Sequence, residues 1–112
     1  MLNPSELLKQ KCHPTEAGLN DKALPEFLAA VPGWDLQDGK IQRKFSFKNF
    51  YETIGFVNAV AFIANREDHH PDLEVGYNRC VVKFNTHSVN GGKGGISEND
   101  FICAAKINAL SN

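Results

Sequence analysis

The stretch EDHHPD (residues 67–72) places two adjacent histidines, His69 and His70, between an acidic pair and a proline. The 112-residue chain has only four histidines, so half of its imidazole groups lie in this one segment. Imidazole changes its charge between pH 5 and 8, and it binds metals or transfers protons depending on its neighbours. The pair is therefore a candidate for a metal site or for acid–base chemistry, unless both rings only cover the surface.

A third histidine is expected beside the first two. Residues 73–77 and 80–87 are typical of two strands joined by a turn near Asn78. Because pairing across an antiparallel hairpin advances by equal steps on the two strands, His87 is expected opposite residue 69 or 70. Three of the four histidines are thus predicted to lie in one place.

The electrostatic surroundings of these histidines are expected to differ. His69 and His70 follow a predicted helix, whose carboxyl end attracts cations, and the two preceding acidic residues act in the same direction. His87 lies in a predicted strand, away from these influences. A pair of groups that differ in acidity is what general acid–base catalysis requires.

Two other interpretations of the three histidines stay open. A zinc or iron site would use them together with Asp68 or Asp100, which is a workable set of ligands. Alternatively, the rings only cap a helix and decorate a strand.

Several other classes of site lack their sequence signals. The net charge of −1 does not provide the basic surface of a nucleic-acid-binding protein. The glycine-rich stretch NGGKGG (residues 90–95) lacks the spacing of a phosphate-binding loop. The pair Cys12–His13 falls short of a four-ligand zinc signature, so both residues are interpreted as ordinary residues of an N-terminal arm.

Hydrophobic periodicity predicts the elements that position the histidines. Apolar residues at helical spacing predict a first helix that ends at Pro32, and Asp38-Gly39 predicts a tight hairpin between two strands. A helical period returns over residues 48–68 and predicts a helix of about 18 residues that ends near Asp68. Its apolar stripe is expected to run through Phe50, Ile54, Val57, Ala61 and Ala64, widened by Val60 and Ile63.

A last helix is expected after the glycine-rich loop. Ser97 is its predicted N-cap, and Asp100 stands three residues later at the capping-box position. The order is then helix, two strands, helix, two strands, helix. This order is typical of the α+β class, with a four-stranded antiparallel sheet and three helices packed on one face.

The chain is expected to form one domain. Residues 1–18 are polar and are interrupted by Pro4, Pro14 and Gly18, so they are predicted to be a flexible arm, with a single domain over 19–112. Three widely spaced cysteines indicate reduced thiols in a cytoplasmic protein. No apolar run approaches the length that spans a membrane.

The stretch DHHPDLEVGYNRCVVKFNTH, followed by GISENDF, resembles the pterin-4a-carbinolamine dehydratases, also called 4a-hydroxytetrahydrobiopterin dehydratases. The similarity extends from about Trp34 to the final helix, and its motif positions are His69, His70, Pro71, Tyr77, His87 and Asp100. The chain departs from the family at Asn65, where an acidic residue is expected, and at Leu73, where an aromatic residue is common.

The resemblance implies a dehydratase that removes water from 4a-hydroxytetrahydropterin and gives quinonoid dihydropterin, with no metal or other cofactor. His69 and His87 would transfer protons, and His70 would hold the pterin. The other residues expected to line the pocket are Asp68, Pro71, Asn85, Thr86 and Ser88. Asp100 would orient a histidine, unless it only caps the last helix.

The resemblance also implies partners. A homodimer or homotetramer is expected, together with a functional link to an aromatic amino acid hydroxylase in pterin recycling. Animal members also act as dimerisation cofactors for a homeodomain transcription factor. A non-catalytic pterin-binding or protein-binding module is therefore the alternative function, while nucleic acid and membrane are not expected as direct partners.

Overall fold

A computed structural model describes residues 3–111. Residues 1 and 2 of the predicted arm and residue 112 of the predicted domain lie outside the described part. The sheet is antiparallel, in the order β1 (Asp35–Gln37), β2 (Lys40–Ser46), β4 (Arg79–Phe84) and β3 (Asp72–Val75). The α-helices are α1 (Pro4–Lys9), α2 (Leu24–Ala29), α3 (Phe50–Glu67) and α4 (Glu98–Asn108). Short 3₁₀ turns span Asn90–Gly92 and Ala109–Ser111. The predicted α+β class with a four-stranded antiparallel sheet is confirmed.

The hairpin between β1 and β2 forms where the Asp-Gly pair predicts it. Asp38 and Gly39 both have positive φ, 50° and 77°, and the flanking residues Gln37 and Lys40 pair with each other. A two-residue turn of this kind matches the right-handed twist of the strands, and aspartate and glycine tolerate positive φ better than other residues.

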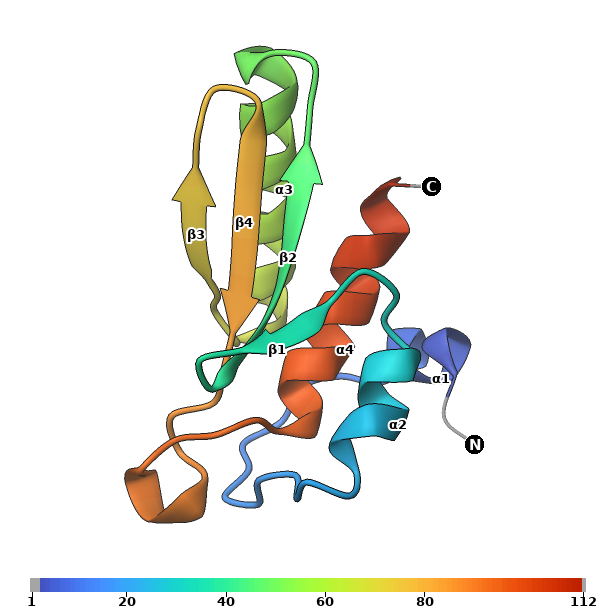
Figure 1. The fold of residues 1–112 in the computed structure, drawn as a ribbon, viewed down its shortest axis with the longest axis vertical. Coiled ribbons are helices and arrows are strands. Elements are labelled where there is room, and N and C mark those ends of the chain that lie inside the picture. Colours follow the sequence, from blue (N-terminus) through green and yellow to red (C-terminus); the bar gives the residue numbers. More distant parts are fainter. Residues whose placement is uncertain (1–2, 112) are drawn as a thin grey trace.

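Helix α3 lies against one face of the sheet (Figure 1). Its 18 residues begin after Asn49, whose side chain accepts a hydrogen bond from the Glu52 N–H, and end at the C-cap Asp68. The length and end agree with the prediction. The predicted apolar stripe is confirmed at Val60 and Ala64, which are buried, whereas Phe50 and Ala61 are exposed. Thr53, Phe56 and Glu67 are buried although they were not part of the predicted stripe.

Specific contacts explain why Thr53 and Phe56 of α3 are buried. The hydroxyl of Thr53 donates to the carbonyl oxygens of Asn49 and Tyr77, at 3.0 and 2.8 Å, so a polar side chain is accommodated in the buried position. The ring of Phe56 packs between Phe45 and Phe47, with centroids 4.5 and 5.0 Å away. Tertiary partners thus bury positions of the helix that its own apolar pattern does not indicate.

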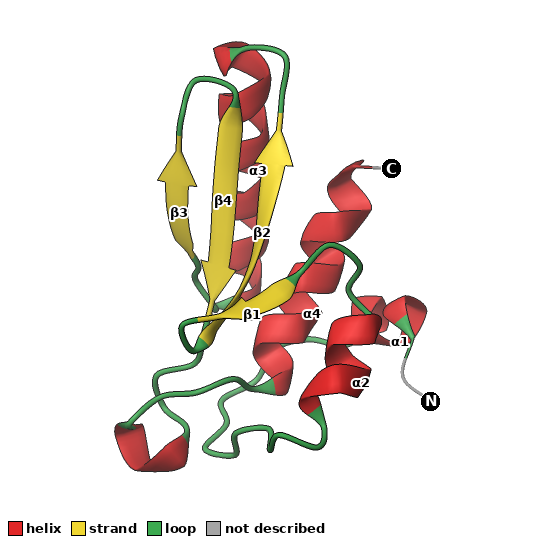
Figure 2. Cartoon of the chain, in the orientation of Figure 1, coloured by secondary structure: helices red, strands yellow, loops and turns green. Residues whose placement is uncertain are grey.

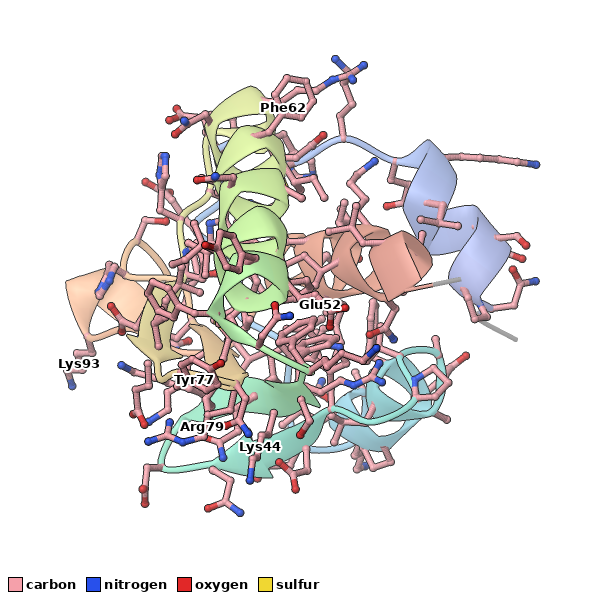
Figure 3. The ribbon with its side chains drawn as sticks, turned by 90° about the horizontal axis from the view of Figure 1, so that it is seen from above. Lys44, Glu52, Phe62, Tyr77, Arg79 and Lys93 are labelled. Atoms are coloured by element: carbon pink, nitrogen blue, oxygen red, sulfur yellow. The ribbon has the colours of Figure 1, made fainter. Side chains whose placement is uncertain are left out.

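The sheet alternates sharply between its two faces. Ile41 and Phe45 of β2, with Cys80, Val82 and Phe84 of β4, are buried against the helices. Lys44 and Arg79 project from the other side of the sheet, away from α3, as Figure 3 shows. This is the period of two that a half-buried antiparallel sheet requires.

The N-terminal segment is more ordered than the sequence predicts. Residues 1–18 are expected to be a flexible arm, but they contain helix α1, which packs against α4, and Leu7 of α1 is only 1% exposed. Asn3 caps this helix and Pro4 occupies its first turn. As a result α4 is covered on several sides, and Figure 2 shows it between the sheet layer and the helices α1 and α2.

Candidate functional site

His69 lies just beyond the end of α3, where the chain reverses. Asp68 has a left-handed conformation (φ 52°, ψ 43°), and the backbone N–H of His69 then donates to the carbonyl oxygen of Ala64 at 3.1 Å. Aspartate tolerates the left-handed region better than most residues because its short polar side chain can hydrogen-bond locally. The end of the longest helix therefore fixes the place of the imidazole.

A buried aspartate fixes the orientation of the same ring. Nε2 of His69 lies 2.6 Å from Oδ1 of Asp100, which is fully buried in the first turn of α4. Oδ2 of Asp100 accepts hydrogen bonds from the Ser97 backbone N–H and the Thr86 hydroxyl, both at 2.9 Å. The two roles expected of Asp100, capping-box residue and histidine partner, are thus both present, one on each oxygen.

One face of the His69 ring packs on an aromatic side chain, and its other ring nitrogen, Nδ1, lies away from the Asp100 contact. The ring stacks on Phe84, with centroids 5.5 Å apart and planes 13° apart, and its side chain is 13% exposed. In the neutral imidazole, the contact with a carboxylate assigns the ring proton to Nε2 and leaves a lone pair on Nδ1. Within residues 3–111 no group hydrogen-bonds to Nδ1, so that nitrogen is available to a ligand.

A cavity of about 270 Å³ adjoins His69. It is lined by Cys12, His13, Pro14, Thr15, Glu67, Asp68, His69, Thr86, Ser88 and Asn99. Its volume approaches the lower end of the usual range for small-molecule sites. Four of the predicted pocket residues, Asp68, His69, Thr86 and Ser88, meet here. A larger hollow of about 370 Å³ adjoins α1 and Arg43, and none of the predicted site residues lines it.

The other two predicted histidines are exposed and do not line this cavity. Nε2 of His70 lies 3.0 Å from Oδ1 of Asn65, the position where the resembling family has an acidic residue. His87 follows the end of β4. The half-buried Pro71 and Asn85 also lie outside the cavity lining.

The register of the β3–β4 hairpin explains the place of His87. Asp72 pairs with Lys83, and continuing the same register by three residues brings Thr86, not His87, opposite His69. The predicted pairing is therefore displaced by at least one residue. Because side chains alternate between faces along a strand, such a shift exchanges the residues that point inward and outward. The turn is centred between Tyr77 and Asn78, slightly earlier than expected.

The first residue of β3, Asp72, has a shifted pKa. The hydrogen bond from Lys40 and its charge hold the pKa of the Asp72 carboxyl below its usual range, and positive charge at His87 and Lys83 acts in the same direction. The Lys40–Asp72 pair is 2.7 Å long, and the Asp72 side chain is 68% exposed.

The sequence analysis missed the contribution of the N-terminal segment to this site. Cys12 and His13 were not among the predicted site residues, yet both line the cavity. The thiol of Cys12 lies 3.6 Å from that of Cys103, and this contact, together with burial, raises the pKa of the Cys103 thiol. The capping signal Asn3-Pro4 was available in the sequence, but the long-range contacts were not.

The described residues do not form a recognisable metal site. Within residues 3–111 no three His, Cys, Asp or Glu side chains are grouped so as to hold an ion. No described helix is long and apolar enough to cross a membrane.

Comparison with known proteins gives a consistent result. The sequence pattern of the family described as pterin 4 alpha carbinolamine dehydratase matches residues 17–110. A relative from Bdellovibrio bacteriovorus is 60% identical over 99% of this chain and 92% of its own length. A relative from Nitrosomonas eutropha is 48% identical over 98% of this chain and 97% of its own length. Both carry the name pterin-4-alpha-carbinolamine dehydratase as a provisional assignment.

Solved structures share the fold. A crystal structure described as a transcriptional coactivator/pterin dehydratase from Brucella melitensis has a TM-score of 0.77 and 36% identity, and covers 85% of this chain and 99% of its own. A pterin dehydratase-like protein identified as a RuBisCO assembly factor in the alpha-carboxysome has a TM-score of 0.56 and 18% identity, and covers 70% of this chain and 87% of its own. The second similarity concerns the fold alone.

Proposed function

The chain belongs to the pterin 4 alpha carbinolamine dehydratase family, and from this premise we propose that it removes water from a 4a-hydroxytetrahydropterin to give the quinonoid dihydropterin. The single observation that carries the proposal within this chain is the His69–Asp100 pair at the wall of a cavity of about 270 Å³. A buried carboxylate that orients an imidazole is an arrangement suited to proton transfer.

The reaction requires two proton movements and no change of oxidation state. The hydroxyl oxygen on C4a gains a proton and leaves as water, while N5 loses its proton and forms the double bond to C4a. The atoms and charges balance without a metal, a nucleotide or a covalent intermediate. We therefore propose that the protein needs no cofactor and that the pterin is only its substrate.

His69 is suited to one of these proton movements. Its Nε2–H is held by Asp100, so Nδ1 is the nitrogen that accepts a proton from the substrate or returns it. The carboxylate stabilises the imidazolium that forms, because it lies 2.6 Å away and is shielded from water. The stacked Phe84 keeps the ring in one plane.

We assign the second proton movement to His87 and the retention of the pterin to His70. His87 stands between Thr86 and Ser88, which both line the cavity, so a short movement of this exposed side chain would bring it to the entrance. His70 follows His69 directly and is steadied by Asn65. Asp68, Pro71 and Asn85 complete the proposed binding surface around them.

The proposal extends to the assembly and place of the protein. Exposed aromatic residues on α3, with Tyr51 90% and Phe62 65% exposed, are consistent with a homodimer or homotetramer, and Figure 3 shows Phe62 projecting from that helix. The free thiols of Cys12, Cys80 and Cys103 support a cytoplasmic location, where a link to an aromatic amino acid hydroxylase would supply the substrate.

A second candidate is a pterin-binding or protein-binding module without catalysis. The specific observation in its favour is the exposure of His70 and His87 outside the cavity, which leaves His69 as the one predicted catalytic histidine that lines it. The Brucella melitensis protein, which is described as a transcriptional coactivator/pterin dehydratase, provides a precedent for a protein-binding role.

One kinetic experiment separates these functions. Purified full-length protein is added to synthetic 4a-hydroxytetrahydropterin, and loss of the hydroxylated compound is followed by absorbance, with and without a chelator. We expect dehydration to exceed the buffer rate and to be insensitive to chelator. In the His69→Ala variant the acceleration should fall by about 10²–10⁴-fold, the usual contribution of one general acid or base. Binding without any acceleration would favour the second candidate.

A further inference from the structure

The segment Cys12–Thr15 forms one wall of the cavity whose other wall carries His69. The family pattern matches residues 17–110, so this wall lies outside the part of the chain that the pattern describes. The segment is nevertheless close to the proposed chemistry, because it shares the cavity with Asp68, His69 and Thr86. Its role therefore needs an explanation of its own.

The segment is held by specific hydrogen bonds. Asn99 binds the backbone of His13 on both sides, through Oδ1 to the N–H at 3.2 Å and through Nδ2 to the carbonyl oxygen at 2.6 Å. The Cys12 N–H donates to Glu67 at 2.8 Å, and the Ser88 hydroxyl donates to the Thr15 carbonyl oxygen at 2.7 Å. Cys12, His13 and Thr15 are thus each held by a hydrogen bond to their backbone, and Pro14 lies between two of them.

One turn of α4 positions both walls. Asn99 holds the N-terminal segment and the next residue, Asp100, holds the imidazole of His69. Adjacent helical residues differ by about 1.5 Å along the axis and point in different directions, so the spacing between the two walls is set by a rigid element. Asn99 is 5% exposed and Asp100 is fully buried, which makes this turn part of the core.

We propose that the Cys12–Thr15 segment is a built part of the substrate site and that His13 supplies a further imidazole contact to the bound pterin. Nδ1 of His13 lies 3.2 Å from the carbonyl oxygen of Pro14. That contact places the ring proton on Nδ1 and leaves Nε2 as a hydrogen-bond acceptor. The pyrimidine edge of a pterin carries N–H donors that such an acceptor recognises.

The position of His13 argues for binding rather than proton transfer. The residue is exposed, and it lines both the His69 cavity and an adjoining hollow of about 240 Å³. It therefore stands where a ligand would extend beyond the reacting centre. His13 is a specificity-determining residue in this scheme, which rests on the proposed function only for the identity of the ligand.

The test compares His13→Ala, His13→Gln and Lys11→Ala in the full-length protein. Lys11 is an exposed neighbour that does not line the His69 cavity, so it is the matched control. In the dehydration assay, loss of one hydrogen bond should raise KM about fivefold in His13→Ala and leave kcat within about twofold. His13→Gln should recover part of the loss, because its amide oxygen also accepts, and Lys11→Ala should match the parent.

A binding measurement separates failure of this inference from failure of the proposed function. Calorimetric titration with a tetrahydropterin that lacks the 4a-hydroxyl group reports binding whether or not the protein catalyses dehydration. Weaker binding to His13→Ala than to Lys11→Ala supports the inference even if no dehydration is found. Equal KM values and equal affinities in the two variants would overturn it, as would absence of binding to the unmodified protein.

Discussion

Nε2 of His69 and Oδ1 of Asp100 lie 2.6 Å apart, although 31 residues separate them in the chain. The histidine leaves the carboxyl end of α3 and the aspartate enters the first turn of α4, so the contact joins the two helices that pack on each other beside the sheet. The same carboxylate ties Thr86 and Ser97 through its other oxygen. The orientation of the His69 ring and the packing of the core therefore depend on one side chain, Asp100.

Replacing Asp100 with asparagine should lower kcat more than it changes KM. Asparagine has one acceptor oxygen in place of two, so it can accept from the His69 ring or from the Ser97 N–H but not from both, and it cannot stabilise an imidazolium by charge. We expect kcat to fall at least about tenfold, which corresponds to about 1.4 kcal/mol of lost transition-state stabilisation. Steady-state dehydration kinetics across pH would measure it. An unchanged kcat with normal folding would exclude a charge role for Asp100.

Replacing Thr86 with valine should destabilise the protein. The buried hydroxyl of Thr86 contacts both Asp100 and Ser97, and valine of similar shape leaves those polar atoms with fewer partners. A loss of about 1–3 kcal/mol in unfolding free energy is expected, measured by denaturant titration followed by circular dichroism. Thr86→Ser keeps the hydroxyl and serves as the control. Equal stability of the two variants would contradict the network.

Replacing Leu7 with alanine should reveal whether helix α1 belongs to the folded core. Leu7 is 1% exposed, whereas the next residue, Leu8, is 39% exposed. Leu7→Ala should lower the unfolding free energy by about 2–5 kcal/mol, because a buried leucine is lost, and Leu8→Ala should cost much less. The midpoint of chemical denaturation gives both values. Similar small losses would restore the expectation of a flexible arm over residues 1–18.

The three thiols should differ in reactivity. Burial raises the pKa of Cys80, and the contact with Cys12 together with burial raises that of Cys103, so neither forms the nucleophilic thiolate readily near neutral pH. Cys12 is half-buried. At pH 8, iodoacetamide should therefore modify Cys12 first and the other two only on unfolding, as mass spectrometry of peptides would show. Rapid labelling of Cys103 in the native protein would disprove the docking of Cys12 on it.

The Lys40–Asp72 pair should make a small contribution that depends on pH. Because Lys40 lowers the pKa of Asp72 in the folded state, the stabilisation is fully present above the ordinary value of 3.8 and is lost as the pH falls through the lowered value. The pair is exposed, so Lys40→Met should cost at most about 1 kcal/mol at pH 7 and nothing at low pH. Thermal unfolding at several pH values tests this, with Lys40→Arg as the control.

Elements encoded by local signals could be predicted from the sequence. The Asp38-Gly39 turn, the 18-residue length of α3 and the capping box at Ser97 each depend on residues within a few positions of one another. Such interactions are present in the sequence pattern itself. They sufficed for the fold class and for the place of His69.

Features that depend on long-range contacts could not be predicted in the same way. Thr53 is buried because its hydroxyl finds a carbonyl oxygen 24 residues away, and the wall around His13 exists because Asn99 lies 86 residues further along. Helix α1 has only six residues, too few to be stable without the core that buries Leu7. The place of His87 required the strand register, which a one-residue error in the turn is enough to change.

The left-handed backbone conformation of Asp68 matters to anyone who engineers this protein for thermal stability or for ligand binding. Glycine adopts a positive φ at no steric cost, so Asp68→Gly would be an attractive choice for anyone seeking only a higher melting temperature. Greater freedom of glycine in the unfolded chain would offset part of that gain, and the exchange would also remove an acidic group that lines the cavity. Thermal robustness and the proposed ligand binding thus compete at a single residue, and libraries built to improve one should be screened for loss of the other.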